Sequence, residues 1–304
     1  MNKYILLLSI IITLSISCKS ADDRSTEIDT PTSGEINMSV DETLQPIAEA
    51  QVDVFQHSYP NAKVNIRYRS ENECVTDLYN DSCKMIFLGR KLNDTEMKLF
   101  KAQTFNPPHV MICTDAIALV VNKSNPDTNI TYDRFLRILK GEDTKFNIVF
   151  DDQKSGTVNY LLGLSGGKLP ANAFNAKSNL NAVNYVVEHK EALGVIGWSW
   201  ISDSDDPKTR DYLSKVNLVS LSSKDKDDKA FYKPYQLYLA QGKYPLSREV
   251  YSIQRERRVG LATGFTAFIY SEIGQTIMLK AGLLPSNQQE RWIEIKTKPI
   301  GKVN

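Results

Sequence analysis

The chain has 304 residues, enough for one or two domains with a large buried core. Lys and Arg number 37 and Asp and Glu 36, for a formal net charge of +1, and this balance disfavours a dedicated nucleic-acid surface. Three His and four Cys in no clustered spacing offer little to a metal ion, so we expect no metal site.

The first 18 residues are typical of a lipoprotein signal peptide. Lys3 precedes an apolar run over residues 4–16 that is too short to span a bilayer comfortably. The run ends in Ser17 and Cys18 and resembles a bacterial lipobox, although Leu14 lies one position further from the cysteine than usual. The alternative is a plain secretory signal with an incidental cysteine. We expect export to the periplasm or cell surface, with a lipid anchor on Cys18.

Residues 19–34 are rich in Ser, Thr, Asp and Pro without hydrophobic period, which predicts a flexible tether. The folded part is expected to begin near Glu35. Alternation of apolar and polar residues predicts strands at 36–40 and 62–68, and a short apolar run at 85–88 predicts a buried parallel strand. The intervening helices are predicted from residue 41 to about 57 and around 75–78.

The same alternation of strands and helices continues toward the C-terminus. Strands are predicted at 116–122, 148–150, 195–198, 216–219 and 235–239, and helices at 132–140, from Thr157 onward, and over 265–277. Gly282 and Pro285 follow the last helix and are typical of a helix C-terminus. This order favours α/β layers with mostly parallel sheets.

Three cysteines remain if Cys18 is lipidated. Cys74 and Cys83 are close enough in sequence to close a short disulfide loop in an oxidising compartment. Equally, these two residues and Cys113 can be free, buried apolar side chains. The sequence leaves both interpretations open.

The most informative motif runs over residues 148–157. A strand and a short loop lead to Ser155, Gly156 and Thr157, which open a helix. Free N–H groups and the positive end of the dipole at a helix N-terminus attract anions, and Gly156 allows a ligand to approach the backbone. The alternative is that Ser155 and Thr157 only cap the helix. No complete nucleotide-binding or penicillin-recognising motif surrounds these residues.

Two further candidates follow predicted strands. Thr43 comes after the first strand, at another strand-to-helix junction, and Arg90 follows the strand at 85–88. Arginine can grip an oxyanion with two parallel charged hydrogen bonds. All these candidates lie beyond the C-terminal ends of strands, where open α/β sheets bind ligands.

The chain resembles the substrate-binding proteins of bacterial phosphate ABC importers, the PstS-like family with the type II periplasmic-binding-protein fold. The matching segments keep their order over nearly all of residues 34–290. They lie at residues 39–43, 89–96, 118–122, 125–126, 138–141, 155–157, 194–198, 244–248, 274–275 and 282–285.

The resemblance implies two lobes, each a mostly parallel sheet flanked by helices, with the ligand in the cleft between them. One lobe would combine residues 34–112 with 235–304, and the other would be 113–234. Thr43 and the segment from Ser155 to Thr157 match pocket residues of the family, and Ser70 lies near the expected place of another pocket serine.

Two positions depart from the family pattern. Asp151 stands where other members carry an arginine, and Arg90 stands near their pocket aspartate. We therefore hypothesise that Arg90 grips the anion, while Asp151 orients Arg90 or accepts a hydrogen from a protonated ligand. Such an acceptor would favour hydrogen phosphate over sulfate.

The resulting expectation is a monomeric, lipid-anchored receptor that binds inorganic phosphate for an ABC permease, with no cofactor, nucleic acid or catalytic role. One alternative keeps the fold with another oxyanion such as sulfate, molybdate or a phosphorylated metabolite. The other is a surface sensor or structural lipoprotein without a transport role. A phosphate-ester hydrolase would lack metal ligands and a credible nucleophile.

Overall fold

The computed structural model describes residues 29–203 and 205–287. The predicted signal peptide, Cys18 and residues 19–28 of the predicted tether lie outside this part. The described chain is packed from its first residue, because Asp29 Oδ2 accepts a hydrogen bond of 2.7 Å from the backbone N–H of Leu261. The first strand then begins at Gly34.

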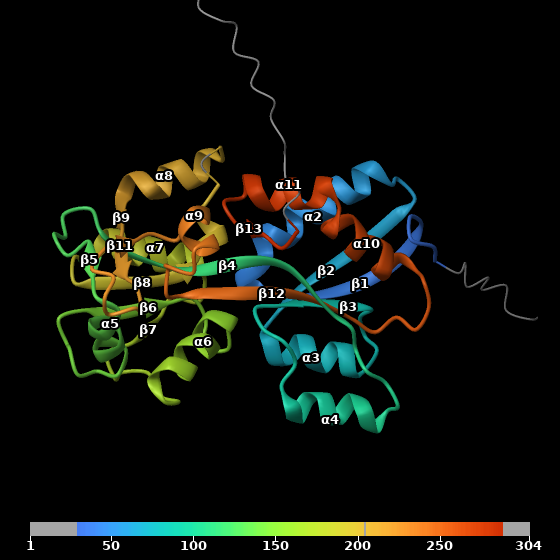
Figure 1. The fold of residues 1–304 in the computed structure, drawn as a ribbon, viewed down its shortest axis with the longest axis horizontal. Helices are drawn as coiled ribbons and strands as arrows, with labels where there is room; N and C mark the ends of the chain where they lie inside the picture. The colour runs from blue at the N-terminus through green and yellow to red at the C-terminus, as the bar shows by residue number, and fades with distance from the viewer. Residues whose placement is uncertain (1–28, 204, 288–304) are drawn as a thin grey trace, which may run out of the picture.

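Two sheets share one long strand, β4 (His109–Asn122), which runs beside β12 (Ser247–Gln254) across the middle of the molecule (Figure 1). In the first sheet the order is β2-β1-β3-β12-β4, and in the second it is β4-β8-β6-β7. The other strands on these two paths are β1 (Gly34–Asp41), β2 (Ala62–Arg69), β3 (Met85–Leu88), β6 (Asn147–Phe150), β7 (Phe174–Asn175) and β8 (Ala192–Gly197). Two short strands, β9 (Val216–Leu218) and β13 (Leu284–Pro285), also pair with β4. Pairing is parallel within β2-β1-β3 and within β8-β6-β7, whereas β4 and β12 run antiparallel to their neighbours.

Helices cover both faces of each sheet, so each half of the molecule has three layers (Figure 1). In the first half these are α2 (Gln45–Ser58), α3 (Glu71–Tyr79), α4 (Asp94–Ala102), α10 (Leu261–Tyr270) and α11 (Glu272–Lys280). In the second half they are α5 (Tyr132–Leu139), α6 (Gly156–Ser165), α7 (Asn179–Glu188) and α8 (Pro207–Lys215). The short helix α9 (Gln236–Ala240) contacts β13. Short elements complete the fold: η1 (Glu42–Leu44), η2 (Trp198–Trp200), β5 (Asn129–Ile130), β9 (Val216–Leu218), β10 (Ser220–Ser222), β11 (Phe231–Tyr232) and β13 (Leu284–Pro285).

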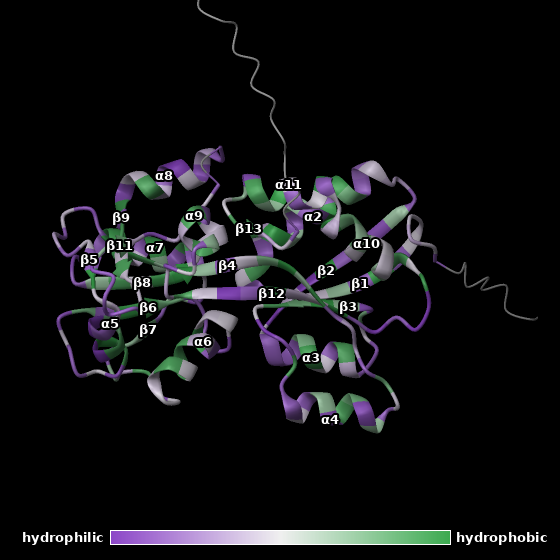
Figure 2. Cartoon of the chain, viewed as in Figure 1, coloured by the Kyte–Doolittle hydropathy of each residue, from purple (hydrophilic) through white to green (hydrophobic). Residues whose placement is uncertain are grey.

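The core lies on both faces of the sheets, because helices cover each side. Every residue of β3 and of β8 is buried, as expected for central strands. Figure 2 shows β4 and β8 as mainly hydrophobic, β12 with a hydrophilic stretch, and the outer helix α8 as mainly hydrophilic. Cys74, Cys83 and Cys113 are buried free thiols, which agrees with the second of the two interpretations of the cysteines. Within the described residues, no helix has the length and hydropathy to cross a bilayer.

The two-lobed α/β fold class predicted from the sequence is confirmed, but one local prediction was wrong and one central strand was not predicted. The segment 235–239 alternates like a strand, yet it forms the short helix α9, where Leu239 is buried and Leu237 is 59% exposed. Gln236 fixes this helix by donating two hydrogen bonds of 2.7 Å to the carbonyls of Leu279 and Leu283. The sequence reading also missed β12, the central antiparallel strand. The lobe boundaries at 112/113 and 234/235 stay a prediction.

Candidate functional site

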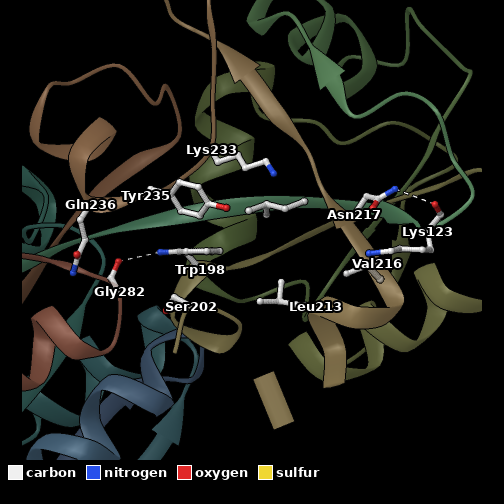
Figure 3. Close-up of a pocket in the computed structure, with 11 residues that line it drawn as sticks. Lys123, Trp198, Ser202, Leu213, Val216, Asn217, Lys233, Tyr235, Gln236 and Gly282 are labelled. Atoms are coloured by element: carbon white, nitrogen blue, oxygen red, sulfur yellow. Dashed lines mark hydrogen bonds between the residues drawn. The ribbon is translucent and has the colours of Figure 1, made fainter. Parts of the chain in front are cut away.

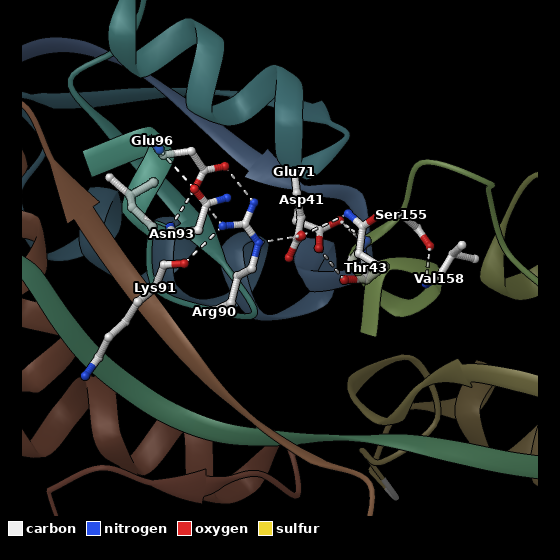
Figure 4. A network of polar contacts seen from close by, with 12 residues as sticks. Asp41, Thr43, Glu71, Arg90, Lys91, Asn93, Glu96, Ser155 and Val158 are labelled. Carbon is white, nitrogen blue, oxygen red and sulfur yellow. Dashed lines mark hydrogen bonds and ion pairs between the residues drawn. The ribbon is translucent and has the colours of Figure 1, made fainter. Parts of the chain in front are cut away.

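The loops that follow β1, β3 and β6 converge between the two sheets (Figure 4). They bring Thr43 together with the segment from Ser155 to Thr157, although more than 100 residues separate them in sequence. The direct link is a hydrogen bond of 3.4 Å from the backbone N–H of Gly156 to Asp41 Oδ1. We call the group formed by Asp41, Thr43, Glu71, Ser155, Gly156, Thr157 and Arg248 the interlobe cluster.

The N-terminus of α6 provides the donors of this cluster. Ser155 is the N-cap: its Oγ accepts from Val158 N at 3.1 Å and donates to Asp151 Oδ1 at 2.6 Å. The capping role considered for Ser155 is thus confirmed. Thr157 is fully buried, and its Oγ1 has no hydrogen-bond partner among the described residues. Thr157 therefore has a hydroxyl free for a ligand.

Gly156 is required by close packing against acidic groups. A Cβ at this position would lie 2.0 Å from Asp41 Oδ2 and 2.9 Å from Glu71 Oε1. Any larger residue would push these two carboxyl groups away from the end of the helix. Two acidic side chains from the first sheet therefore lie directly against the α6 N-terminus.

Asp41 and Thr43 form the opposite wall. Asp41 Oδ1 accepts from Thr43 N at 3.3 Å, and Asp41 Oδ2 accepts from Thr43 Oγ1 at 3.0 Å. The Thr43 carbonyl accepts from Trp200 Nε1 at 3.1 Å, a second contact between the two halves. Burial, and then the negative charge of Glu71, raise the pKa of Asp41 to about 7, although Arg248 acts in the opposite direction.

Arg248, on β12, is the buried cation of the cluster. Its Nε and Nη2 donate to Asp115 Oδ2 at 3.1 and 2.9 Å, and the two side chains are 2% and 0% exposed. Its Nη1 has no partner among the described residues. Burial lowers the pKa of Arg248, but the carboxyl groups of Asp115 and Asp41 outweigh this effect and raise it above its usual value.

Arg90 occupies a different position from the one that we expected. Its guanidinium donates to Glu71 Oε2 at 3.0 Å and to both carboxylate oxygens of Glu96 at 2.8 and 3.0 Å. Asp151 instead accepts from Ser155 and, at 3.2 Å, from Asn179 Nδ2. The structure does not bring Arg90 and Asp151 together, and their part in anion binding stays a prediction. Burial raises the pKa of Asp151 to about 6, against the lowering effect of the Ser155 hydrogen bond.

Ser70, expected as a pocket serine, caps a helix, and its part in anion binding stays a prediction. Ser70 is the N-cap of α3, and its Oγ donates to Glu73 Oε2 at 2.8 Å. Glu71 is 2% exposed and accepts from Arg90 and, at 3.0 Å, from Asn159 Nδ2 on α6. Glu71 thus connects the two halves of the molecule, a role that the sequence reading missed.

The chemical capacity of the cluster follows from its free donors. A helix N-terminus favours negative charge, and Thr157 Oγ1 and Arg248 Nη1 are buried donors without partners among the described residues. A buried donor without a partner costs about 1–3 kcal/mol, so a ligand that supplies acceptors recovers that cost. The arrangement suits a small oxyanion.

A second hollow lies at the surface and does not share residues with this cluster. It has a volume of about 570 Å³ and is lined by residues of β9, the Trp198 region and the segment 233–236. Figure 3 shows Trp198 and Tyr235 on one side and Lys123 and Val216 on the other. The converging strand ends and the buried donors belong to the interlobe cluster instead, which makes that cluster the candidate ligand site.

Comparison with known proteins agrees with this fold. Residues 25–272 match the family model described as the PBP superfamily domain. The phosphate-binding protein PstS of Pseudomonas aeruginosa is 23% identical over 282 residues, covering 83% of each chain. The protein of the same name from Bacillus subtilis is 21% identical over 286 residues, covering 88% of this chain and 86% of that one.

Solved structures give the same result. One from Clostridium perfringens, described as a phosphate ABC transporter substrate-binding protein with bound phosphate, superimposes with a TM-score of 0.70 at 21% identity, covering 84% of this chain and 100% of that one. An ABC-type phosphate transport receptor from Vibrio cholerae gives 0.64 at 20% identity, covering 82% and 99%. With a family match over most of its length and this two-lobed architecture, the chain belongs to the PBP superfamily.

Proposed function

We propose that this protein is an extracytoplasmic receptor that binds phosphate and delivers it to an ABC importer. The observations that carry the proposal are two buried donors without partners among the described residues: Thr157 Oγ1 in the first turn of α6, and Nη1 of Arg248, whose charge acts on Asp41 and Asp151. The names of the relatives from Pseudomonas aeruginosa and Bacillus subtilis support phosphate as the anion.

The chemistry of the donors favours a tetrahedral oxyanion over a neutral solute. Backbone N–H groups of the first helical turn point along the helix axis toward the ligand, and the helix dipole adds a partial positive charge there. The Arg248 guanidinium has a full charge and one N–H-bearing nitrogen to spare. Charge-assisted hydrogen bonds of this kind are about twice as strong as neutral ones.

Closure of the two lobes would complete the site. We propose the lobe boundaries 34–112 with 235–304 for one lobe and 113–234 for the other, with β4 and β12 as the connecting strands. Hydrogen bonds already join the halves at Gly156–Asp41, Asn159–Glu71 and Trp200–Thr43. A ligand held between α6 and the β1 end would add to these bonds and favour the closed form.

The cellular setting is part of the same proposal. An apolar leader that ends in Cys18 supports export and lipid anchoring at the membrane that holds the permease. We further propose that the protein acts as a monomer and is a transport receptor rather than an enzyme, as the names of its relatives suggest.

Isothermal titration with phosphate, sulfate and molybdate tests the function. We expect phosphate to bind, and Thr157→Val to weaken binding at least tenfold, because the loss of one buried hydrogen bond to a charged group costs about 1.5–3 kcal/mol. Thr95→Val, at an exposed position on α4, is the matched control and is expected to bind like the parent. Tighter binding of sulfate or molybdate would assign a different anion. No binding of any of the three would refute the proposal.

A further inference from the structure

We propose that the carboxyl group of Asp41 regulates the site: as a carboxylate it occupies the anion-binding end of α6, and phosphate binds tightly only after Asp41 has taken up a proton. This inference rests on the proposed phosphate function and adds a control by pH to it. Asp41 would then be an internal competitor of the ligand.

The geometry places Asp41 where an anion would bind. Its Oδ1 accepts the backbone N–H of Gly156 at 3.4 Å, and its Oδ2 lies 2.0 Å from the position of a Cβ on Gly156. The side chain is fully buried, and its other contacts are with Thr43 N and Thr43 Oγ1. These are the kinds of donor, helix N–H and threonine hydroxyl, that a bound oxyanion would use.

The charges around Asp41 give the physical reason why its carboxylate would compete with phosphate. Glu71 and Cys74 face Asp41 from α3, Arg248 faces it from β12, and Gly156 faces it from α6. Arg248, the cation that acts on Asp41, already shares its charge with Asp115. The charge of Glu71 is engaged with Arg90. A phosphate dianion added to an ionised Asp41 would place like charges together in a buried space, where their repulsion is strong.

Protonation removes this charge conflict and weakens the hydrogen bond from Gly156 N, so that Asp41 can give up the end of α6 to the ligand. A neutral Asp41 keeps an oxygen that accepts from Thr43 N, and its new O–H can donate to a phosphate oxygen. Burial and the neighbouring Glu71 raise the pKa of Asp41 to about 7, so the exchange falls within the physiological range. At pH 8 only about one molecule in ten would carry the proton, which weakens the apparent affinity about tenfold.

The test compares the full chain with Asp41→Asn and Asp41→Ser between pH 6.0 and 8.5. Both substitutions remove the charge and keep a side chain that caps η1 well. Asp41→Ser keeps the test possible if Asp41→Asn does not fold. Isothermal titration measures the dissociation constant for phosphate. Asp53→Asn, an exposed carboxylate on α2, is the control. Because phosphate itself titrates in this range, the informative quantity is the ratio of parent to variant dissociation constants at each pH.

We expect this ratio to be near one at pH 6 and to reach about ten at pH 8, with the variants binding more tightly than the parent. The Asp53→Asn ratio should stay near one throughout. A ratio independent of pH, or variants that bind more weakly than the parent at every pH, would overturn the inference while leaving the phosphate function intact. Absence of phosphate binding by the parent and every variant would instead overturn the proposed function.

Discussion

Variants of the pair Arg248–Asp115 can separate the contribution of Arg248 to protein stability from its contribution to ligand binding. In Arg248→Met, the Asp115 carboxyl group loses both of its hydrogen bonds from Arg248, at 2.9 and 3.1 Å, while its side chain stays 0% exposed. Removing one partner of a buried pair costs about 3–5 kcal/mol. Urea unfolding of this single variant should show that loss in the free energy of unfolding.

The double variant Arg248→Met/Asp115→Leu should recover most of this stability, because apolar residues of similar volume commonly replace a buried ion pair without cost. It should nevertheless bind phosphate more weakly, since the free Nη1 of Arg248 is lost. A charge-assisted hydrogen bond of about 1.5–3 kcal/mol corresponds to a roughly 10- to 150-fold weaker dissociation constant. A double variant that folds and binds phosphate within threefold of the parent would refute the assignment of Arg248 to the ligand.

Other predictions concern single residues. Gly156→Ala should lower the free energy of unfolding in urea, because its Cβ would lie 2.0 Å from Asp41 Oδ2 and 2.9 Å from Glu71 Oε1; an alanine variant with unchanged stability would contradict the close packing. Arg90→Ala should reduce the free energy of unfolding by about 1–3 kcal/mol, since Glu71 loses a partner; the phosphate affinity of the same variant tests the sequence-based hypothesis for Arg90, which predicts a large loss. Burial raises the pKa of Asp151 to about 6 in the native state, whereas the pKa in the unfolded chain is near 3.8. The free energy of unfolding should therefore fall as the pH rises between these two values, by at most about 3 kcal/mol. Asp151→Asn should flatten that part of the stability profile in urea unfolding, and an unchanged slope would count against the buried proton.

Much of the fold could be predicted because its local signals agree with its packing. Strands such as β3 are short apolar runs that can only be buried, and β1 and β2 alternate clearly. The segment that forms α9 was predicted as a strand, because its five residues alternate between apolar and polar by chance. Its helical conformation is fixed by contacts with Leu279 and Leu283. Such contacts are not visible in local sequence.

The candidate site was only partly predictable for a related reason. The residue types from Ser155 to Thr157 are typical of a helix N-terminus, and in the structure helix α6 begins there as expected. Arg248 lies in the segment 244–248 that resembles the family, but nothing in that segment marks it as a site residue, because its role depends on Asp115, 133 positions away in sequence. Glu71 was missed because the adjacent Ser70 fits the family pattern, while the helix turn directs Glu71 toward α6.

A crystal structure of the full chain grown with phosphate tests the central claim most directly. We predict a tetrahedral ligand within hydrogen-bond distance of Gly156 N, Thr157 Oγ1 and Arg248 Nη1. Asp41 should be displaced from Gly156 N, or lie close enough to a ligand oxygen to share a proton with it. Phosphate bound at Arg90 instead, or an interlobe cluster unchanged and empty beside a ligand bound elsewhere, would contradict it.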